Sequence, residues 1–197
     1  MIATFRVHDL LPTDWRLEVL TAAAHEATPF KRVGPTETAP DSAGLSYSVI
    51  EYPLVRRRLP WMVGLHTHLA DRAGEALGVA LTPSRHPQCA INVNVIEGRG
   101  GAYEMHLDTM PYTGVLFIEK CAGGDFLHGS RDPDLCRRIS PDAGLFVVGK
   151  LSEIWHGVAP ITRGVRVSVP FGFEPHGTPR RAPYNPGGFI PSAKEAS

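Results

Sequence analysis

The sequence predicts a mainly β domain with helices near its N-terminus. From Cys89 onward, short runs of β-favouring residues alternate with glycine and proline, a texture typical of antiparallel sandwiches and barrels, of which the jelly roll is one. Before Cys89, two segments carry apolar residues at helical spacing. No internal repeat is evident, and 197 residues suffice for one sizeable core, so a single domain is expected.

The helices are expected in residues 1–88. One begins near Asp14 and runs to about Ala27, because the acidic Asp14 and Glu18 suit a helix start. Another runs from about Pro60 to Leu77, where apolar residues recur every four positions along one stripe. A helix with one apolar stripe is expected to pack on a sheet.

The expected β-type runs are short and mostly follow Cys89. Turn-forming residues dominate residues 29–44, so this segment is read as turns. The β-type runs cover residues 2–7, 45–50, 90–97, 102–106, 114–120, 125–128, 145–148 and 163–173.

The domain is expected to span residues 1–174, with the helix-containing part at 1–88 and the β core at about 89–173. The tail, residues 175–197, holds five prolines and few aliphatic side chains. It is expected to be disordered or draped over the surface, because it has little to bury.

Charge and cysteine content narrow the class of protein. Lysine and arginine total 20, as do aspartate and glutamate, so no large cationic field attracts nucleic acid or anionic lipid, and neither partner is expected. The three cysteines lie far apart without a Cys-x-x-Cys spacing, which disfavours a disulfide framework or a zinc ribbon. With no signal-type N-terminus and no apolar run long enough for a bilayer, the protein is expected to be cytoplasmic. A monomer or a homodimer is expected.

A His-x-Asp pair, His106 and Asp108, is the first candidate for chemistry. In an extended chain, residues two apart point to the same face, so the imidazole and the carboxylate converge. His156 begins the last β-type region and is the candidate third ligand. Two histidines and one carboxylate form the facial triad of non-haem Fe(II) oxygenases, so iron is the implied metal.

An anion clamp is expected close to this cluster. Arg166 and Ser168 follow His156 on a β-type run and share one face, so a guanidinium and a hydroxyl would meet one carboxylate. Arg163 competes for this role, but it precedes Gly164 and reads as a turn residue.

Several motifs occur together, in order and at matching spacing. They are Tyr103-x-x-His106-x-Asp108, Gly123-Gly124-Asp125-Phe126, Pro141-x-x-Gly144 and the run from His156 through Pro160 and Gly164 to Arg166. With them, residues 90–173 resemble the 2-oxoglutarate/Fe(II)-dependent dioxygenases of the prolyl-4-hydroxylase-like group. The resemblance implies a double-stranded β-helix, a jelly-roll variant.

The resemblance also implies the roles of the site residues. His106, Asp108 and His156 would bind Fe(II), and Arg166 with Ser168 would hold the distal carboxylate of the cosubstrate 2-oxoglutarate, with dioxygen as co-reactant. Ascorbate is expected to support activity. Family halogenases carry a small residue in place of the aspartate, so the presence of Asp108 favours hydroxylation over halogenation. Desaturation, ring closure and epimerisation stay open.

Two positions depart from the family pattern. Many relatives carry tyrosines that hydrogen-bond the cosubstrate where this chain has Ile96 and Phe117. Asn92 and Asn94 are polar residues on one face of an otherwise apolar run, and they are candidates to replace those hydroxyls; the competing interpretation is that they face solvent.

Three residues are candidates to contact substrate. Tyr103 keeps its family position, although strict alternation turns it away from the face of His106, and His128 lies in the resembling region. Arg56 belongs to a basic run, residues 56–58, that is normally a solvated surface and would select an anionic substrate if its loop folded over the iron.

The predicted function is therefore hydroxylation of an unactivated C–H bond in a small molecule, such as an amino acid or a natural-product intermediate, with release of succinate and carbon dioxide. A peptidyl hydroxylase acting on prolyl residues is the alternative enzyme. A non-catalytic jelly-roll protein that keeps the triad for structure, or holds zinc, is the alternative outside the enzymes.

Overall fold

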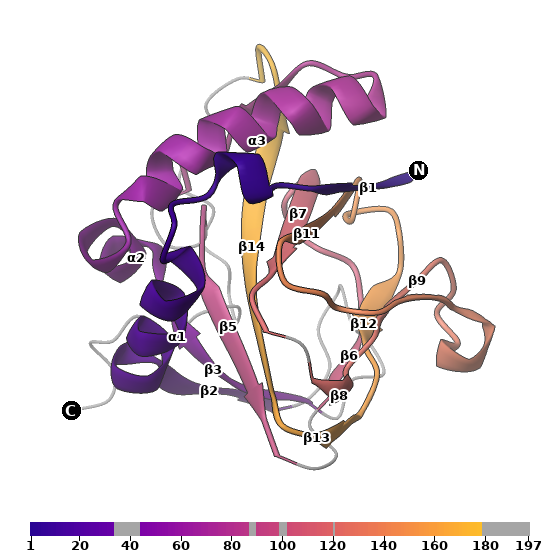
Figure 1. The fold of residues 1–197 in the computed structure, drawn as a ribbon. Helices are drawn as coiled ribbons and strands as arrows, with labels where there is room; N and C mark the ends of the chain where they lie inside the picture. The colour runs from indigo at the N-terminus through magenta and orange to yellow at the C-terminus, as the bar shows by residue number, and fades with distance from the viewer. Residues whose placement is uncertain (34–43, 87–89, 99–101, 120, 179–197) are drawn as a thin grey trace.

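The structure, a computed structural model, describes residues 1–33, 44–86, 90–98, 102–119 and 121–178 (Figure 1). The helices are η1 (His8–Leu10), α1 (Trp15–Glu26), α2 (Tyr52–Arg58), α3 (Trp61–Leu77) and η2 (Pro133–Leu135). The strands are β1 (Ile2–Arg6), β2 (Thr28–Val33), β3 (Gly44–Ile50), β4 (Leu81–Pro83), β5 (Val93–Glu97), β6 (Tyr103–His106), β7 (Tyr112–Phe117), β8 (Ala122–Gly123), β9 (Phe126–His128), β10 (Arg137–Ile139), β11 (Leu145–Gly149), β12 (His156–Val158), β13 (Ile161–Arg163) and β14 (Val165–Pro175).

The strands form two main antiparallel sheets. The larger has the order β1-β11-β7-β14-β5-β3-β2, with β4 also paired to β14. The smaller has the order β10-β9-β12-β6, and β13 pairs with β8 at one end. One cavity is lined by residues of both sheets, so the sheets face each other across it, as in a jelly roll. The predicted fold class is confirmed.

The long strand β14 divides the molecule into two environments. Its odd-numbered residues from Val167 to Phe173 are buried in the main hydrophobic core, whereas its even-numbered residues from Arg166 to Glu174 line the cavity. This separation follows from the two-residue period of a strand.

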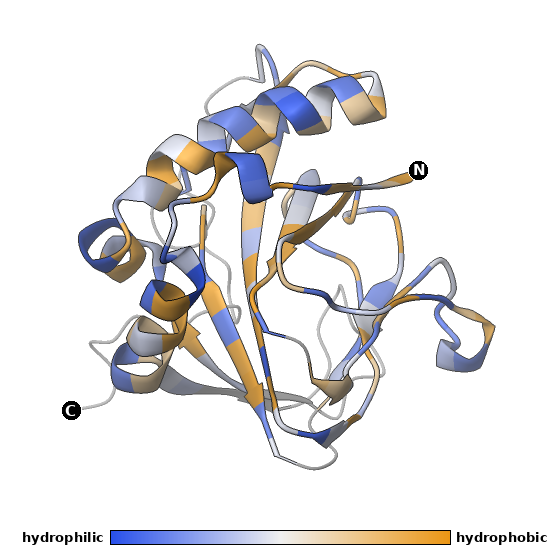
Figure 2. Cartoon of the chain, viewed as in Figure 1, coloured by the Kyte–Doolittle hydropathy of each residue, from blue (hydrophilic) through white to orange (hydrophobic). Residues whose placement is uncertain are grey.

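The core lies between the large sheet and the helices. The buried stripe of α3, which includes Leu65, Leu69 and Ala73, shares one cluster with the outer face of β14. The apolar faces of α1 and α2 join the same cluster, and Figure 2 shows hydrophobic residues alternating with hydrophilic ones along the central strands. The left-handed Gly78 ends α3 (φ +68°), a conformation that favours glycine.

Several expectations about local structure were wrong. Residues 28–33 form β2 although turns were expected from residue 29 onward, because six ladder positions on β3 pair with them. The run of residues 56–58 lies on the short helix α2 and not in a loop. The strands β4, β8, β10, β12 and β13 were not expected as separate elements, because segments of two or three residues are defined by a partner strand and not by local pattern.

Two expectations concern the C-terminal part of the chain, and both stay predictions. β14 continues to Pro175, one residue past the expected domain boundary. The prediction of a disordered or surface-draped tail falls almost entirely on residues 179–197, which lie outside the described residues. None of the helices in the described part combines the length and hydrophobicity needed to cross a bilayer.

Candidate metal centre and anion pocket

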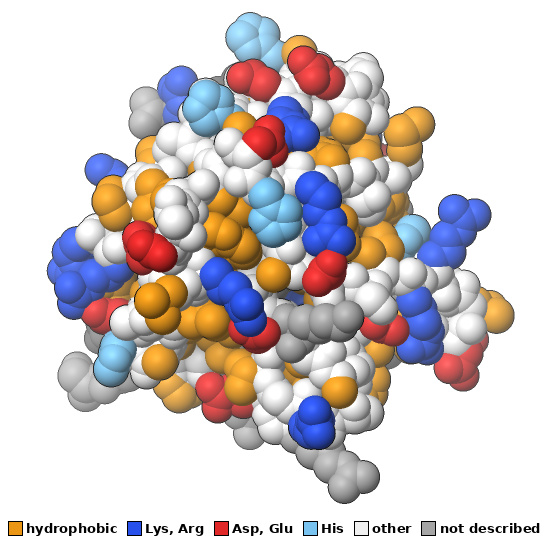
Figure 3. All heavy atoms as spheres, viewed as in Figure 1, with side chains coloured by type: hydrophobic (Ala, Val, Ile, Leu, Met, Phe, Trp, Pro, Cys, Tyr) orange, Lys and Arg blue, Asp and Glu red, His pale blue; other side chains and the backbone are white. Residues whose placement is uncertain are grey.

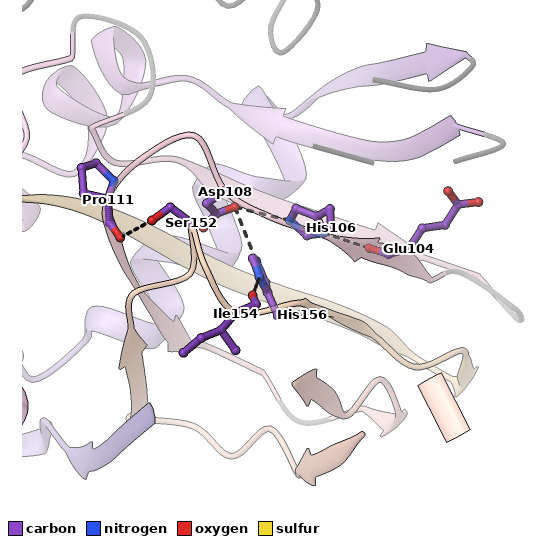
Figure 4. A network of polar contacts seen from close by, with 7 residues as sticks. All are labelled: Glu104, His106, Asp108, Pro111, Ser152, Ile154 and His156. Atoms are coloured by element: carbon purple, nitrogen blue, oxygen red, sulfur yellow. Dashed lines mark hydrogen bonds and ion pairs between the residues drawn. The ribbon is translucent and has the colours of Figure 1, made fainter. Parts of the chain in front are cut away.

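Three side chains from separate segments converge in the cavity (Figure 4). His106 ends β6, Asp108 lies in the turn that follows, and His156 begins β12. The two histidines are direct cross-strand partners, and each Nε2 lies 3.4 Å from Oδ1 of Asp108. The three ligand atoms lie within 4.8 Å of one another. This is the spacing of a cluster that shares one ion.

Backbone carbonyls orient both imidazoles. Nδ1 of His106 lies 2.8 Å from the carbonyl oxygen of Glu104, and Nδ1 of His156 lies 3.0 Å from that of Ile154. A carbonyl only accepts, so each Nδ1 carries a hydrogen, and each Nε2 is turned toward Asp108, where it can bind a proton or a metal ion. Such contacts fix the tautomer and ring orientation of metal-binding histidines.

The electrostatics of this cluster also favour a cation. Burial alone would raise the pKa of Asp108, but the imidazoles of His156 and His106 outweigh it and hold that pKa well below its usual range. Asp108 is therefore a half-buried carboxylate that faces the Nε2 atoms of two imidazoles. Two imidazole nitrogens and one carboxylate oxygen are the donors of facial-triad Fe(II) centres, so the residues present fit that ion.

Two local features hold the ligands in place. The hydroxyl of Ser152 donates to the carbonyl of Pro111 at 3.0 Å (Figure 4). The backbone N–H of Asp108 donates to the carbonyl of Leu151 at 3.0 Å, so the loop after β11 holds both ends of the segment from Asp108 to Pro111. A Cβ on Gly157 would lie 2.7 Å from the carbonyl oxygen of Tyr103. Glycine after His156 therefore lets β12 approach β6 closely.

The predicted clamp residue Arg166 is almost fully buried, at 3% exposure. Its Nε donates to the carbonyl of Gly124 (3.2 Å), Nη1 donates to the hydroxyl of Ser168 (2.8 Å), and its guanidinium lies 5.2 Å from the ring centre of Phe117. Burial lowers the pKa of Arg166 to about 10. No ion pair to a carboxylate is found for it among the described residues.

The Gly-Gly turn shapes the approach to Arg166. Gly124 has φ +68°, and a Cβ there would lie 2.7 Å from Sγ of Cys121 and 3.3 Å from Cδ of Arg166. Glycine at this position therefore leaves room for the arginine stem. Arg163, the competing candidate, is exposed on β13.

The metal cluster and Arg166 line the same cavity, which has a volume of about 1330 Å³. The wall between them includes the inner faces of β5 and β14 and the aromatic residues Tyr47, Tyr103 and Phe126. The face of the molecule in Figure 3 carries acidic and basic side chains interspersed, which agrees with the neutral composition.

The two departures from the family pattern lie beside Arg166. Ile96 is its direct cross-strand partner, and Phe117 contacts its guanidinium. Asn94 is the cross-strand partner of Ser168, and its buried Oδ1 has no hydrogen-bond partner among the described residues. Asn92 and Asn94 both line the cavity, which removes the interpretation that they simply face solvent, and their binding role stays a prediction.

The three candidate substrate residues have different positions. Tyr103 lines the cavity with its ring centre 4.7 Å from that of His106, so the expectation that it turns away was wrong. The pairing of β12 with β6 shifts register between His156 and Val158, and such an irregularity breaks strict alternation.

His128 and Arg56 are the other two candidates. His128 pairs with His156 across β9 and β12 but is not part of the cavity lining. Arg56 does line the cavity, from α2, with its guanidinium 5.9 Å from the ring centre of Tyr52. A substrate contact by either residue stays a prediction.

Sequence reasoning missed several residues of the cavity wall. They are Tyr47, Ser84, Thr113 and Glu174. Tyr47 faces Ile96 across two neighbouring strands, since Ser48 pairs with Val95. For Tyr47, the only signal in the sequence was the alternation of residues 45–50, and alternation does not say which face of a strand meets the cavity.

The architecture is that of the 2-oxoglutarate/Fe(II) oxygenases, as the resemblance predicted. No family model matches the sequence, and no curated protein matches it. The similarity is therefore seen in the fold and not in the overall sequence.

Three solved structures illustrate it. A prolyl-4-hydroxylase from Pseudomonas putida is 18% identical over 89% of this chain and 93% of its own, with a TM-score of 0.58. An oxidoreductase of the 2OG-Fe(II) oxygenase family from Burkholderia pseudomallei is 15% identical over 89% and 85%, with a TM-score of 0.61. The non-haem α-ketoglutarate-dependent epimerase SnoN from nogalamycin biosynthesis is 16% identical over 87% and 77%, with a TM-score of 0.57.

Proposed function

We propose that this chain is an Fe(II)- and 2-oxoglutarate-dependent oxygenase that hydroxylates an unactivated C–H bond of a small molecule. The observation that carries the proposal is Arg166, a buried guanidinium without a carboxylate partner in the described chain, in the same cavity as the His106–Asp108–His156 cluster. A buried charge requires a partner, and a ligand carboxylate supplies it.

Each group in the cavity has a defined task in this reaction. An Fe(II) ion held by the cluster supplies dioxygen activation, coupled to decarboxylation of 2-oxoglutarate to succinate and carbon dioxide. Arg166 binds the distal carboxylate of 2-oxoglutarate, and Ser168 holds the guanidinium in place and offers its hydroxyl to the same anion. The apolar walls at Ile96 and Phe117 keep water from this ion pair and so strengthen it.

The cavity is larger than 2-oxoglutarate alone requires. Ligand sites for molecules of drug size have volumes of about 300–1,000 Å³, and this cavity has about 1330 Å³. Space therefore remains for a substrate beside the cosubstrate. The triad retains its aspartate, which the resemblance associates with hydroxylation.

Succinate formation tests the proposal. The purified protein, given Fe(II), ascorbate and 2-oxoglutarate in air, should produce succinate slowly without added substrate. Asp108→Ala should abolish this and reduce the binding of Fe(II), because it removes the only anionic ligand. Asp71→Ala, at an exposed position on α3, is the matched control and should behave as wild type. If the protein binds Fe(II) and 2-oxoglutarate but never yields succinate, it is instead the non-catalytic metal-binding jelly roll.

A prolyl peptide is the alternative substrate, and the likeness in fold to a prolyl-4-hydroxylase supports it. Proline-containing peptides added to the same assay distinguish the two classes. Stimulation of succinate formation by such a peptide, with a mass gain of one oxygen on the peptide, would replace the small-molecule proposal.

A further inference from the structure

The cavity has a second polar region at the opposite end of β14 from Arg166. Glu174 lines it on the inner face of the strand, eight residues beyond Arg166, or about 26 Å along an extended strand. Apart from Asp108, Glu174 is the only acidic residue of the described cavity wall. A carboxylate therefore lies at the end of the cavity opposite Arg166.

Two buried hydroxyls lie on this side of the cavity, and one of them contacts the carboxylate. Ser84, at 4% exposure, donates from Oγ to Oε1 of Glu174 at 3.2 Å and accepts from the backbone N–H of His86 at 3.2 Å. Thr113, at 7% exposure, is a diagonal neighbour of Glu174 on the same face, since its cross-strand partner Gly172 lies two residues before Glu174. Its buried Oγ1 has no partner among the described residues. A buried hydroxyl without a hydrogen-bond partner destabilises the folded protein, and a ligand that bonds to it removes this cost.

The charge of Glu174 is not balanced within the described chain. The carboxylate forms no ion pair there, and Arg85, which also lines the cavity, is exposed and makes none with it. Ser84 uses its one hydrogen on Oε1, so Oε2 and the oxygen of Thr113 are open to hydrogen-bond donors of a bound molecule.

The turn that carries Asp108 connects this region to the metal centre. Met110 lies two residues after Asp108, so their Cα atoms are at most about 7 Å apart. The sulfur of Met110 lies 3.9 Å from Oγ of Ser84, which itself contacts Glu174. Glu174 and the metal centre are therefore close enough for one small molecule to contact both.

We infer that Glu174, together with Thr113 and Ser84, forms a subsite that binds an ammonium group of the substrate, several bonds from the carbon that is oxidised. This inference rests on the proposed oxygenase function and adds the substrate class. An ammonium group supplies three donors and a positive charge, which match a carboxylate and a hydroxyl oxygen. The carboxylate also repels a second 2-oxoglutarate, so the cosubstrate is confined to the Arg166 end.

The test compares charged and neutral forms of the same molecules. The common L-amino acids and the linear diamines are each assayed beside their N-acetylated forms, and succinate formation is expressed relative to the rate of the same variant without a probe. At least one amine should stimulate wild type, and its acetylated form should stimulate it at least about tenfold less, because acetylation removes the charge. Glu174→Gln should lose that preference, and Thr113→Val should weaken it. Glu75→Gln, exposed on α3, should keep it.

Binding measured by ligand-observed NMR separates the possible failures. If wild type forms basal succinate but binds amines and N-acetylated forms equally, or if Glu174→Gln keeps the preference for amines, the subsite is wrong and the oxygenase proposal stands. Equal stimulation by uncharged polyols would also overturn it. If wild type forms no succinate but still binds amines through Glu174, the oxygenase proposal fails and the ammonium subsite stands.

Discussion

The two faces of β14 differ in what their side chains accomplish. From Val167 to Phe173 the outer row is apolar and buried in the core that the large sheet shares with the helices. The inner row contains Arg166, Ser168 and Glu174 and borders a cavity. One strand thus supplies stability on one side and recognition on the other. Substitutions on the outer row should change the free energy of unfolding, and those on the inner row should change ligand binding.

The largest expected effect comes from the outer row. Phe171→Ala should lower the free energy of unfolding by about 3–5 kcal/mol, because it leaves a cavity in a core where Phe171 is 0% exposed. Urea denaturation measures this loss. In the fraction that remains folded, the affinity for Fe(II) should be unchanged; a matching loss of metal affinity would show that the two faces are coupled.

A pH effect on stability comes next, from His66 on α3. His66 is buried against Phe171 and Phe173, and its Nε2 donates to the carbonyl of Gly172 at 2.7 Å. Burial lowers the pKa of His66 to about 4, although the hydrogen bond to Gly172 opposes this. Between pH 6.5 and 4 the unfolded chain therefore binds a proton that the folded chain does not. The contribution of His66 to the free energy of unfolding is therefore fully present above pH 6.5. It should fall by about 3 kcal/mol as the pH drops from 6.5 to 4 and stay constant below pH 4.

Urea denaturation at several pH values measures this dependence. His66→Gln removes it, so wild type should lose about 3 kcal/mol more than this variant between pH 6.5 and 4. His68→Gln, on the exposed face of the same helix, is the control and should retain the wild-type slope. Parallel curves for wild type and His66→Gln would show that the proton is bound elsewhere.

The inner row should show the reverse pattern. Arg166→Met should raise the Kd for 2-oxoglutarate roughly 10- to 100-fold, because a charge-assisted hydrogen-bonded pair is worth about 1.5–3 kcal/mol. Stability should stay constant or rise, since the variant no longer buries a charge. Isothermal titration with Fe(II) present gives the affinity, and urea denaturation gives the stability. An unchanged Kd would move the clamp to another cation.

The smallest effect is expected at the exposed end of the outer row. Val165→Thr keeps the β-branched shape, and Val165 is already 37% exposed, so stability should change by less than about 0.5 kcal/mol. The same denaturation experiment measures it. A larger loss of stability would mean that the burial of a residue in the outer row does not determine how much it contributes to the free energy of unfolding.

Much of this comparison was predictable from local patterns. The helices at Trp15–Glu26 and Trp61–Leu77 match the apolar stripe and the start signals to within about two residues. The spacing of His106 and Asp108, and of Arg166 and Ser168, predicted the contacts that the structure shows within each pair. A pattern with a period of two or of 3.6 residues states which neighbours share a face, and this information is local.

The sequence by itself determined the alternation of β14, the two long helices and the donor types of the metal cluster. Only the tertiary structure decided that Tyr103 lies against His106, that α2 brings Arg56 to the cavity, and that Ser84, Thr113 and Glu174 meet at one end of it. These features depend on strand register, on an irregularity between β6 and β12, and on hydrogen bonds across distant segments. Such pairings are set by the packing of the whole chain, so they leave no periodic signal in the residues that take part.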